Sequence, residues 1–222
     1  MELDFSPVAA GWPDLARGAL ATIEVTAASL GVGCVLGLGA GMGRLNPKRQ
    51  PVYAISSAYV LLIRGTPLLV QLFLLFFGLP QFGIVLPAFV CAVLGLGLYS
   101  GAYVAEIVRG AIQSIDRDQT LAAQSLGMTP RQVMRHVVLP QALLRMIPPL
   151  GNEFIALIKN SALVSLLTIP DLMHEGQKII AVSYRSLEVY LAVAAIYLLM
   201  TGSTAWLLRH LEYRLSASRR LG

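Results

Sequence analysis

Long apolar segments alternate with short polar ones along the chain, and this alternation predicts membrane-spanning helices. A helix needs roughly 20 mostly apolar residues to cross a bilayer. Segments of that kind are expected at about residues 20–43, 52–77, 84–108, 147–168 and 189–208. Composition agrees, because 56% of the 222 residues are hydrophobic and only 13% are charged, against about a quarter charged in soluble domains. We therefore predict an all-α transmembrane fold of five spans, in a single domain over residues 1–222.

Basic residues lie beside the apolar segments, so the net charge of +5 reports membrane topology rather than binding to nucleic acid. In chain order they are Arg44, Lys48 and Arg49, then Arg109, Arg117, Arg131, Arg135 and Arg145, and finally Arg209, Arg214, Arg219 and Arg220. The positive-inside rule places the loop 109–146 and the C-terminus in the cytoplasm, and five spans then place the N-terminus outside. The N-terminal stretch 1–13 is acidic, which argues against a cleaved signal peptide. Cys34 and Cys91 fall inside predicted spans, so no disulfide framework is expected.

The longest polar-rich interval is Gln119–Pro140, between the third and fourth apolar segments. It predicts two short helices with a hinge between them. The first covers Gln119–Leu126 and stops at Gly127 in a left-handed conformation. The second is bounded by Thr129 as N-cap, Pro130 as first helical residue, Gln132 as capping-box partner and Pro140 as its end. A compact unit of this kind in a cytoplasmic loop indicates a docking site for another protein.

This interval resembles the EAA loop of bacterial ABC-importer permeases in the spacing of Ala122-Ala123, Gly127 and Leu139-Pro140. The chain from about residue 18 to 214 resembles the branch that imports polar amino acids such as histidine, glutamate, glutamine, arginine and opines. The matching pieces are Arg64-Gly65-Thr66-Pro67, Ser100-Gly101-Ala102-Tyr103 with Glu106 and Arg109, and Leu150-Gly151-Asn152 leading to Lys159-Asn160-Ser161. Two positions depart from the pattern: Leu121 stands where the family has Glu, and Asp118-Gln119 where it has Gly-Gln.

The resemblance implies a MetI-like permease fold in the bacterial inner membrane, with a coupling helix in the cytoplasmic loop. It also implies partners: a second permease, identical or related, two cytoplasmic ATPases, and a periplasmic or lipid-anchored substrate-binding protein. The chain contains no nucleotide-binding motif, so we expect no cofactor on it and ATP with Mg²⁺ on the partner ATPase. It is therefore expected to be a transport subunit and not an enzyme. The expected ATPase-coupling residues are Gln119, Ala122, Ala123, Leu126, Gly127, Met128, Arg131 and Pro140.

Charged and polar side chains inside spans are costly and are candidates for solute binding. They are Arg64, Thr66, Tyr99, Ser100, Asn152, Glu153, Asn160 and Ser161. Arg64, near the middle of the second span, either holds the α-carboxylate of an amino acid or pairs with an internal Glu. Glu153 either accepts an ammonium, guanidinium or imidazolium group or forms a salt bridge with Lys159 or Arg64. Asn152, Glu153, Lys159 and Asn160 are spaced to form one polar stripe on the fourth span.

Other patterns favour structural roles. Gly33, Gly37 and Gly41 recur at every fourth residue, which permits close packing within the chain or, less favoured, a dimer contact. Glu106 and Arg109 are spaced for an ion pair at a helix end. Tyr99, Ser100 and Tyr103 are expected to share one helix face. Pro148 and Pro149 are expected to open the fourth span. Residues 171–180 form either a short interfacial helix or a solvated connection.

The sequence thus predicts the translocating subunit of an ATP-driven importer for polar amino acids, with a preference for basic solutes such as arginine, histidine or an opine. The main alternative is a scaffold permease, which couples to the ATPase while its partner binds the solute. In that case the charges inside the spans would pair with one another. A stand-alone ion-driven transporter is disfavoured, because the chain lacks a carboxylate-rich relay and an internal repeat.

Overall fold

The computed structural model describes residues 3–48 and 50–218, and all regular structure within them is helical. The helices are α1 (Ser6–Ala10), α2 (Trp12–Gly43), α3 (Val52–Arg64), α4 (Leu68–Phe73), α5 (Ala88–Gln113), α6 (Arg117–Ser125), α7 (Pro130–Val133), α8 (Leu139–Asn160), α9 (Leu172–Ser183) and α10 (Ser186–Ser218). Short π-helical or 3-10 turns extend α4, α7 and α8. Three of the basic residues used for topology, Arg49, Arg219 and Arg220, lie outside the described residues.

Within the described residues, four helical segments are long and apolar enough to cross a membrane, and a bent pair makes a fifth. The first and last of them are longer than expected, because α2 begins at Trp12 and α10 extends over Ser186–Ser218. The second span differs most. Its two halves, Val52–Arg64 and Leu68–Phe82, are bent by 105° relative to each other, and the break falls at Gly65 and Pro67, the residues of this span that weaken a helix.

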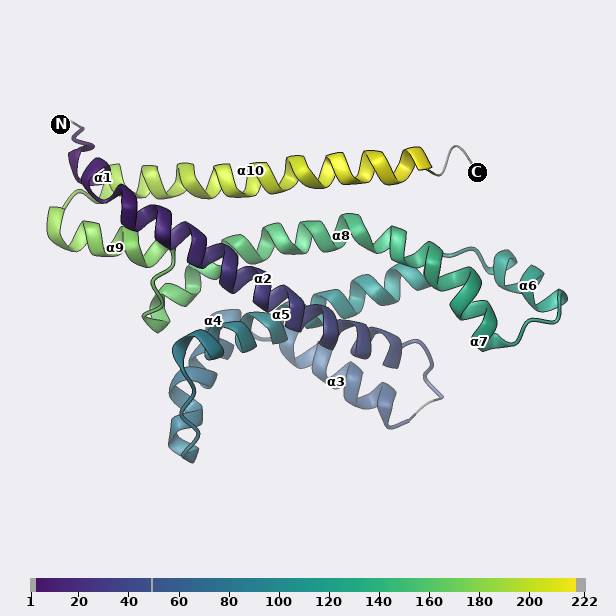
Figure 1. The fold of residues 1–222 in the computed structure, drawn as a ribbon. Helices are drawn as coiled ribbons and strands as arrows, with labels where there is room; N and C mark the ends of the chain where they lie inside the picture. The colour runs from purple at the N-terminus through teal and green to yellow at the C-terminus, as the bar shows by residue number, and fades with distance from the viewer. Residues whose placement is uncertain (1–2, 49, 219–222) are drawn as a thin grey trace.

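The helices lie roughly side by side, with α6 and α7 at one end of the bundle (Figure 1). The end of α10 and the connection between α2 and α3 lie toward that same end, whereas α1 and α9 lie at the other. The segments that the charge pattern predicts to be cytoplasmic thus lie toward one end of the molecule.

The most extensive contact between helices joins α2 and α5. It is possible because glycines of α2 present bare backbone to α5. A Cβ on Gly37 would lie 2.5 Å from the Val104 side chain and 2.8 Å from the carbonyl oxygen of Gly101, and Gly33 and Gly41 are similarly close to α5. Small residues let helices approach closely in lipid, where dispersion forces drive association. This confirms the internal-packing interpretation of the stripe.

The fourth span begins earlier than expected. α7 continues through a π-helical turn, Met134–Val138, directly into α8. Pro140 is therefore near the start of α8 and does not end a helix, which corrects the predicted boundary, and Pro148 and Pro149 lie inside α8 instead of opening it. The π turn explains how the helix continues. Its wider hydrogen-bond spacing changes which carbonyl each N–H reaches, at the point where Pro140 has no backbone N–H to donate.

The expected short helix near residue 171 is present as α9. Asp171 caps its N-terminus by accepting a hydrogen bond from the backbone N–H of His174 at 3.0 Å. The side chain of Asp171 is fully buried, and this burial raises its pKa to about 6. The backbone N–H of Leu172 donates to the Thr22 hydroxyl at 3.1 Å, so α9 is bonded to α2 and is not merely a solvated connection.

The α2–α5 contact predicts a sharp difference between two neighbouring glycines. Gly37→Ala forces a methyl group against Val104 and the Gly101 carbonyl, and overpacking of this kind costs about 1–3 kcal/mol. Gly39→Ala meets no atom within 4 Å and should leave stability nearly unchanged. Thermal unfolding of the two purified variants in detergent measures the difference. Equal unfolding temperatures for the pair would contradict the observed packing.

Candidate functional site

Arg64 is the last residue of α3, at the break in the second span, and not near the middle of a continuous helix. Gly65 follows as C-cap, and Pro67 has an extended backbone with φ −64° and ψ 137°. Gly and Pro both weaken a helix at this point. The break leaves backbone carbonyls of α3 without helical partners, as in the discontinuous helices that form solute sites in many transporters.

Gln71 closes this break, a role that the sequence analysis did not identify. Its Nε2 donates to the carbonyl oxygens of Ile63 at 2.8 Å and Thr66 at 3.2 Å, and to the Thr66 hydroxyl at 2.9 Å. The Thr66 hydroxyl in turn donates to the carbonyl of Leu62 at 2.9 Å. Thr66 and Gln71 together therefore satisfy the acceptors that the bend exposes, and they fix the position of Arg64.

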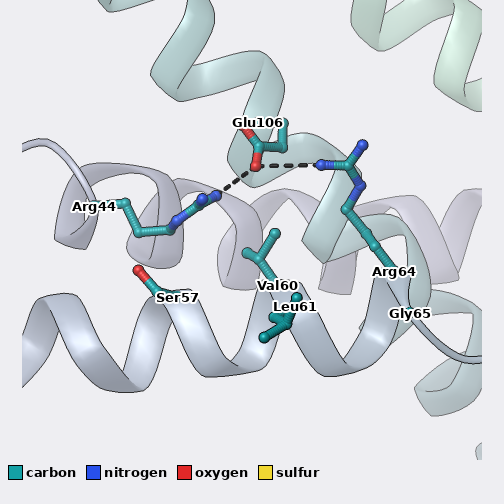
Figure 2. Close-up of a pocket in the computed structure, with 7 residues that line it drawn as sticks. All are labelled: Arg44, Ser57, Val60, Leu61, Arg64, Gly65 and Glu106. Atoms are coloured by element: carbon teal, nitrogen blue, oxygen red, sulfur yellow. Dashed lines mark hydrogen bonds and ion pairs between the residues drawn. The ribbon is translucent and has the colours of Figure 1, made fainter.

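Glu106 of α5 joins three guanidinium groups from different parts of the chain. Its Oε1 lies 2.6 Å from Arg44 and 3.2 Å from Arg64, and its Oε2 lies 2.7 Å from Arg109. Figure 2 shows the carboxylate between Arg44 and Arg64. The expected Glu106–Arg109 pair is confirmed, and so is the alternative in which Arg64 pairs with an internal Glu. Arg44 was used only for topology in the sequence analysis, because its distance from Glu106 along the chain gives no local signal.

A second polar group lies along α5 and faces α8. The Tyr99 hydroxyl donates to that of Tyr103 at 3.2 Å, and the Arg64 guanidinium lies 5.2 Å from the centre of the Tyr103 ring. Tyr99 is within electrostatic range of both Arg64 and Glu153. Tyr103 is therefore beside the arginine at the break, and Tyr99 is bonded to it on the side from which the charge of Glu153 is also felt.

Glu153 lies against Ser100 across the α5–α8 contact, close enough for the Ser100 hydroxyl to interact with its carboxylate, although neither its Oε1 nor that hydroxyl makes a hydrogen bond of standard geometry among the described residues. No salt bridge from Glu153 to Lys159 or Arg64 is present within residues 3–48 and 50–218. The structural alternative for Glu153 is therefore not supported here. A buried carboxylate oxygen without a well-formed hydrogen bond is costly, so Glu153 stays a candidate for solute binding.

The remaining candidate residues on α8 do not join this group equally. Asn152 and Lys159 are exposed, whereas Glu153 and Asn160 are half-buried. Ser161 is fully buried and its hydroxyl donates to the carbonyl of Ile158 at 2.8 Å. Tyr99 is thus in range of the charges of both Arg64 and Glu153, and Ser100 lies beside Glu153. Asn152 and Asn160 lie elsewhere on α8, and Ser161 begins the 3-10 turn that follows it.

The unit formed by α6 and α7, here called the α6–α7 knob, has the predicted turn. Gly127 has φ +82°, the left-handed conformation that glycine adopts without strain. Thr129 and Gln132 form the capping box, with the Thr129 N–H donating to Gln132 Oε1 at 2.8 Å. A Cβ on Gly127 would meet no atom within 4 Å beyond its chain neighbours, so the positive φ, and not a clash with the rest of the chain, is the reason for glycine within this turn.

The α6–α7 knob is exposed on its outer side and anchored on its inner side. Leu126 is 84% exposed, and Gln119, Ala122, Gly127, Arg131 and Pro140 are also exposed, with Met128 half-buried. Ala123 and Val133 are buried in a hydrophobic cluster with residues of α5 and α8, including Val108 and Met146. Of the expected coupling residues, Ala123 is therefore part of the packing against the spans, and Pro140 lies in α8. The other six lie on the outer side of the α6–α7 knob, where Met128 is half-buried.

Comparison with known proteins places these features in a family. The pattern of the family described as "Binding-protein-dependent transport system inner membrane component" matches residues 33–217. The glutamine transport system permease protein GlnP of Escherichia coli is 37% identical over 217 residues, 97% of this chain and 99% of that protein. The L-cystine transport system permease protein TcyB of Bacillus subtilis is 40% identical over 187 residues, 84% of this chain and 80% of that protein.

Solved structures give the same result for the fold. A crystal structure of an amino acid ABC transporter with histidines has a TM-score of 0.92 and 42% sequence identity, and covers 96% of this chain and 100% of its own. The inward-facing MetNI methionine ABC transporter matches with a TM-score of 0.69 over 88% of this chain and 95% of its own, at 23% identity. This second likeness concerns the fold alone.

The hydrogen bonds of Gln71 lead to a stability prediction. Gln71→Leu leaves the carbonyls of Ile63 and Thr66 without their donor, and a partly exposed hydrogen bond of this kind contributes about 0.5–1.5 kcal/mol. Gln81→Leu is the matched control, because Gln81 makes one long contact of 3.5 Å on an exposed surface. Thermal unfolding in detergent should separate the two variants. If both unfold like the wild type, Gln71 does not hold the break.

Proposed function

The chain belongs to the inner membrane components of binding-protein-dependent transport systems, among the permeases of amino-acid ABC importers, and we propose that it carries the solute site as well as the ATPase-coupling surface. The observation that supports this most is the group of Arg64, Tyr99, Ser100 and Glu153 beside the break in the second span. Broken helices at the midplane are where transporters commonly bind solutes.

In this proposal the solute is a zwitterion held at its two ends. Arg64 binds the α-carboxylate, which suits the planar fork of a guanidinium. Glu153 accepts a cationic group, either the α-ammonium or a cationic side chain. Tyr99 and Ser100 supply hydroxyls between them, and Thr66 keeps Arg64 at the end of the broken helix. A bound zwitterion would satisfy the buried Glu153 oxygen that has no partner among the described residues.

Arg64 must exchange partners for this to happen, because it pairs with Glu106 at 3.2 Å. That exchange is inexpensive in electrostatic terms, since Arg44 and Arg109 remain on Glu106 at 2.6 and 2.7 Å. The carboxylate of the solute then replaces Glu106 as the partner of Arg64, while Glu106 keeps Arg44 and Arg109. Arg64 is also the pair member with the most exposed side chain, 43%, against 17% for Arg44.

Coupling to ATP hydrolysis is assigned to the α6–α7 knob, with ATP and Mg²⁺ on two partner ATPases. Its exposed Leu126, Gly127 and Arg131 would fit a cleft of the ATPase on the cytoplasmic side. Closure of the ATPase dimer would move the knob together with α5 and α8, since Ala123 and Val133 are packed against them. Such motion requires that nucleotide favour one orientation of the spans over the other. A second permease and a substrate-binding protein outside complete the proposed importer.

The solute is proposed to be a polar amino acid, and the preference for basic ones rests on Glu153. The names of relatives point to several solutes: glutamine for GlnP, L-cystine for TcyB, and nopaline for NocM of Agrobacterium fabrum, which is 35% identical over 210 residues. If Glu153 binds the α-ammonium, which all amino acids share, neutral solutes suffice. If it binds a side chain, arginine, histidine or an opine is favoured.

The scaffold alternative has one observation in its favour, namely the pairing of Arg64 with Glu106. In a scaffold permease all such charges would be satisfied internally. Glu153 does not fit that description, because its Oε1 is buried without a partner among the described residues. Neutralising Arg64 distinguishes the two functions. A scaffold permease would assemble in lower yield and keep its solute affinity, whereas a solute-binding permease would lose solute affinity.

Leu126 tests the coupling surface. Leu126→Asp places a charge on a side chain that is 84% exposed, so the fold should persist while docking of the apolar tip to the ATPase is lost. We expect at least a tenfold loss of solute-stimulated ATP hydrolysis in proteoliposomes that contain the assembled transporter. Leu126→Met is the control at the same site and should retain stimulation. Full stimulation in the Asp variant would remove the knob from the coupling mechanism.

Glu153 tests the solute site. Glu153→Gln removes the negative charge, and a charge-assisted hydrogen bond contributes about 1.5–3 kcal/mol. We expect arginine to lose at least tenfold in competition for uptake relative to glutamine, measured with the assembled transporter. Lys159→Gln, an exposed position on the same helix, should change nothing. Unaltered discrimination between basic and neutral solutes would disprove the side-chain role of Glu153.

A further inference from the structure

A cavity of about 270 Å³ lies beside Glu106, between α2, α3 and α5. Arg44, Arg64 and Glu106 contribute charged groups to its wall, and Ser57 of α3 contributes a hydroxyl (Figure 2). The cavity is slightly smaller than the roughly 300–1,000 Å³ typical of sites for drug-sized ligands. Its size suits a single ionic group and not a whole nucleotide.

Two of the residues that line this cavity each have a buried polar atom without a hydrogen-bond partner among the described residues: the Nε of Arg44 and the hydroxyl of Ser57. The guanidinium of Arg44 donates to Glu106 through Nη1, so the N–H at Nε remains desolvated and without an acceptor among the described residues. Leaving such a donor unpaired costs free energy. Either donor could reach an oxygen-rich anion once its side chain turns toward the cavity, whereas a cation would find only Glu106.

The charge of the surroundings favours an anion as well. Glu106 is one carboxylate against the guanidiniums of Arg44, Arg64 and Arg109, so the cluster keeps a surplus of positive charge. The side chains of Arg44 and Glu106 are only 17% and 23% exposed. Uncompensated positive charge in a partly desolvated site attracts anions strongly.

The position of the cavity indicates the source of the anion. Arg44 is the C-cap of α2, at the end of the bundle that also carries the α6–α7 knob (Figure 1). Leu61, which lines the cavity, is 74% exposed, and the adjacent Leu62 is 64% exposed. An ionic pocket flanked by apolar surface matches a phosphate with acyl chains, and basic pockets between spans on the cytoplasmic side bind anionic headgroups.

We propose that this pocket binds the phosphate of an anionic phospholipid from the cytoplasmic leaflet, with Arg44 and Ser57 as its principal donors. The proposal rests on the orientation proposed above, and it adds a lipid site that is separate from the Glu153 end of the solute site. Arg64 borders both sites. A bound phosphate therefore compensates the surplus charge of the arginine cluster when Arg64 turns toward a solute.

Lipid retention tests the proposal without requiring transport. The full-length chain in its assembled complex is purified from mixed phosphatidylglycerol and phosphatidylcholine, and retained lipid is counted by native mass spectrometry. We expect preferential retention of phosphatidylglycerol by the wild type. Arg44→Gln should reduce it at least fivefold. Ser57→Ala should reduce it about twofold to threefold with an unchanged unfolding temperature, because no protein group depends on its hydroxyl.

Arg145→Gln is the matched control, since Arg145 of α8 donates to the carbonyl of Ser114, the C-cap of α5, at 2.6 Å and does not line the cavity. Its retention of phosphatidylglycerol should equal that of the wild type. Equal retention by the wild type, Arg44→Gln and Ser57→Ala would overturn the site. Displacement of the lipid by inorganic phosphate alone at millimolar concentration would reassign the pocket to free anions. Displacement by arginine or glutamine would reassign it to the solute path.

These outcomes are independent of the proposed transport function. A chain that retains phosphatidylglycerol through Arg44 but shows no change of solute discrimination in Glu153→Gln keeps its lipid site and loses the proposed solute site. The converse result keeps the solute site and removes the lipid. Because the readouts are retained lipid and uptake competition, failure of one proposal cannot be mistaken for failure of the other.

Discussion

A carboxylate within an apolar environment must be neutralised, and Glu106 is neutralised by guanidiniums from three helices. Arg44 ends α2, Arg64 ends α3, and Arg109 lies one turn further along α5. Removing charges from water is expensive, so a cluster of this kind persists only where its geometry is well satisfied. The ion pairs bring the end of α2 and the break of the second span to the same point on α5. The polar features described above are arranged around that point.

Close packing turns this electrostatic contact into a rigid unit. Gly37 and its neighbours allow α2 to lie directly on α5, while Ala123 and Val133 attach the α6–α7 knob to α5 and α8. α5 therefore takes part in the glycine contact, the arginine cluster, the tyrosine pair and the anchoring of the knob. In the proposed importer, a displacement of the knob is transmitted to the tyrosines without a separate hinge inside α5.

The elements that sequence analysis predicted well depend on neighbours in the chain. The turn at Gly127 and the capping box of Thr129 and Gln132 are local, so residue types three apart suffice to define them. Pro140 was misread because a π turn lets a helix continue where the standard α-helical rule predicts an end. Gln71 and Arg44 were missed because their partners depend on the bend between α3 and α4 and on the approach of α2 to α5, which no local pattern encodes.

The proposed solute site follows from an imbalance of charge that remains after the helices have packed. Glu153 has an oxygen without a partner among the described residues, while the arginine cluster has more cations than carboxylates. An ion pair between Glu153 and Arg64 would neutralise both the carboxylate and the surplus cation. Arg64 instead pairs with Glu106 and lies over the ring of Tyr103. A zwitterion that spans the two tyrosines would supply a cation at one end and an anion at the other. Transport requires such binding to be reversible, and a competing carboxylate at Glu106 gives Arg64 a partner to return to when the solute leaves.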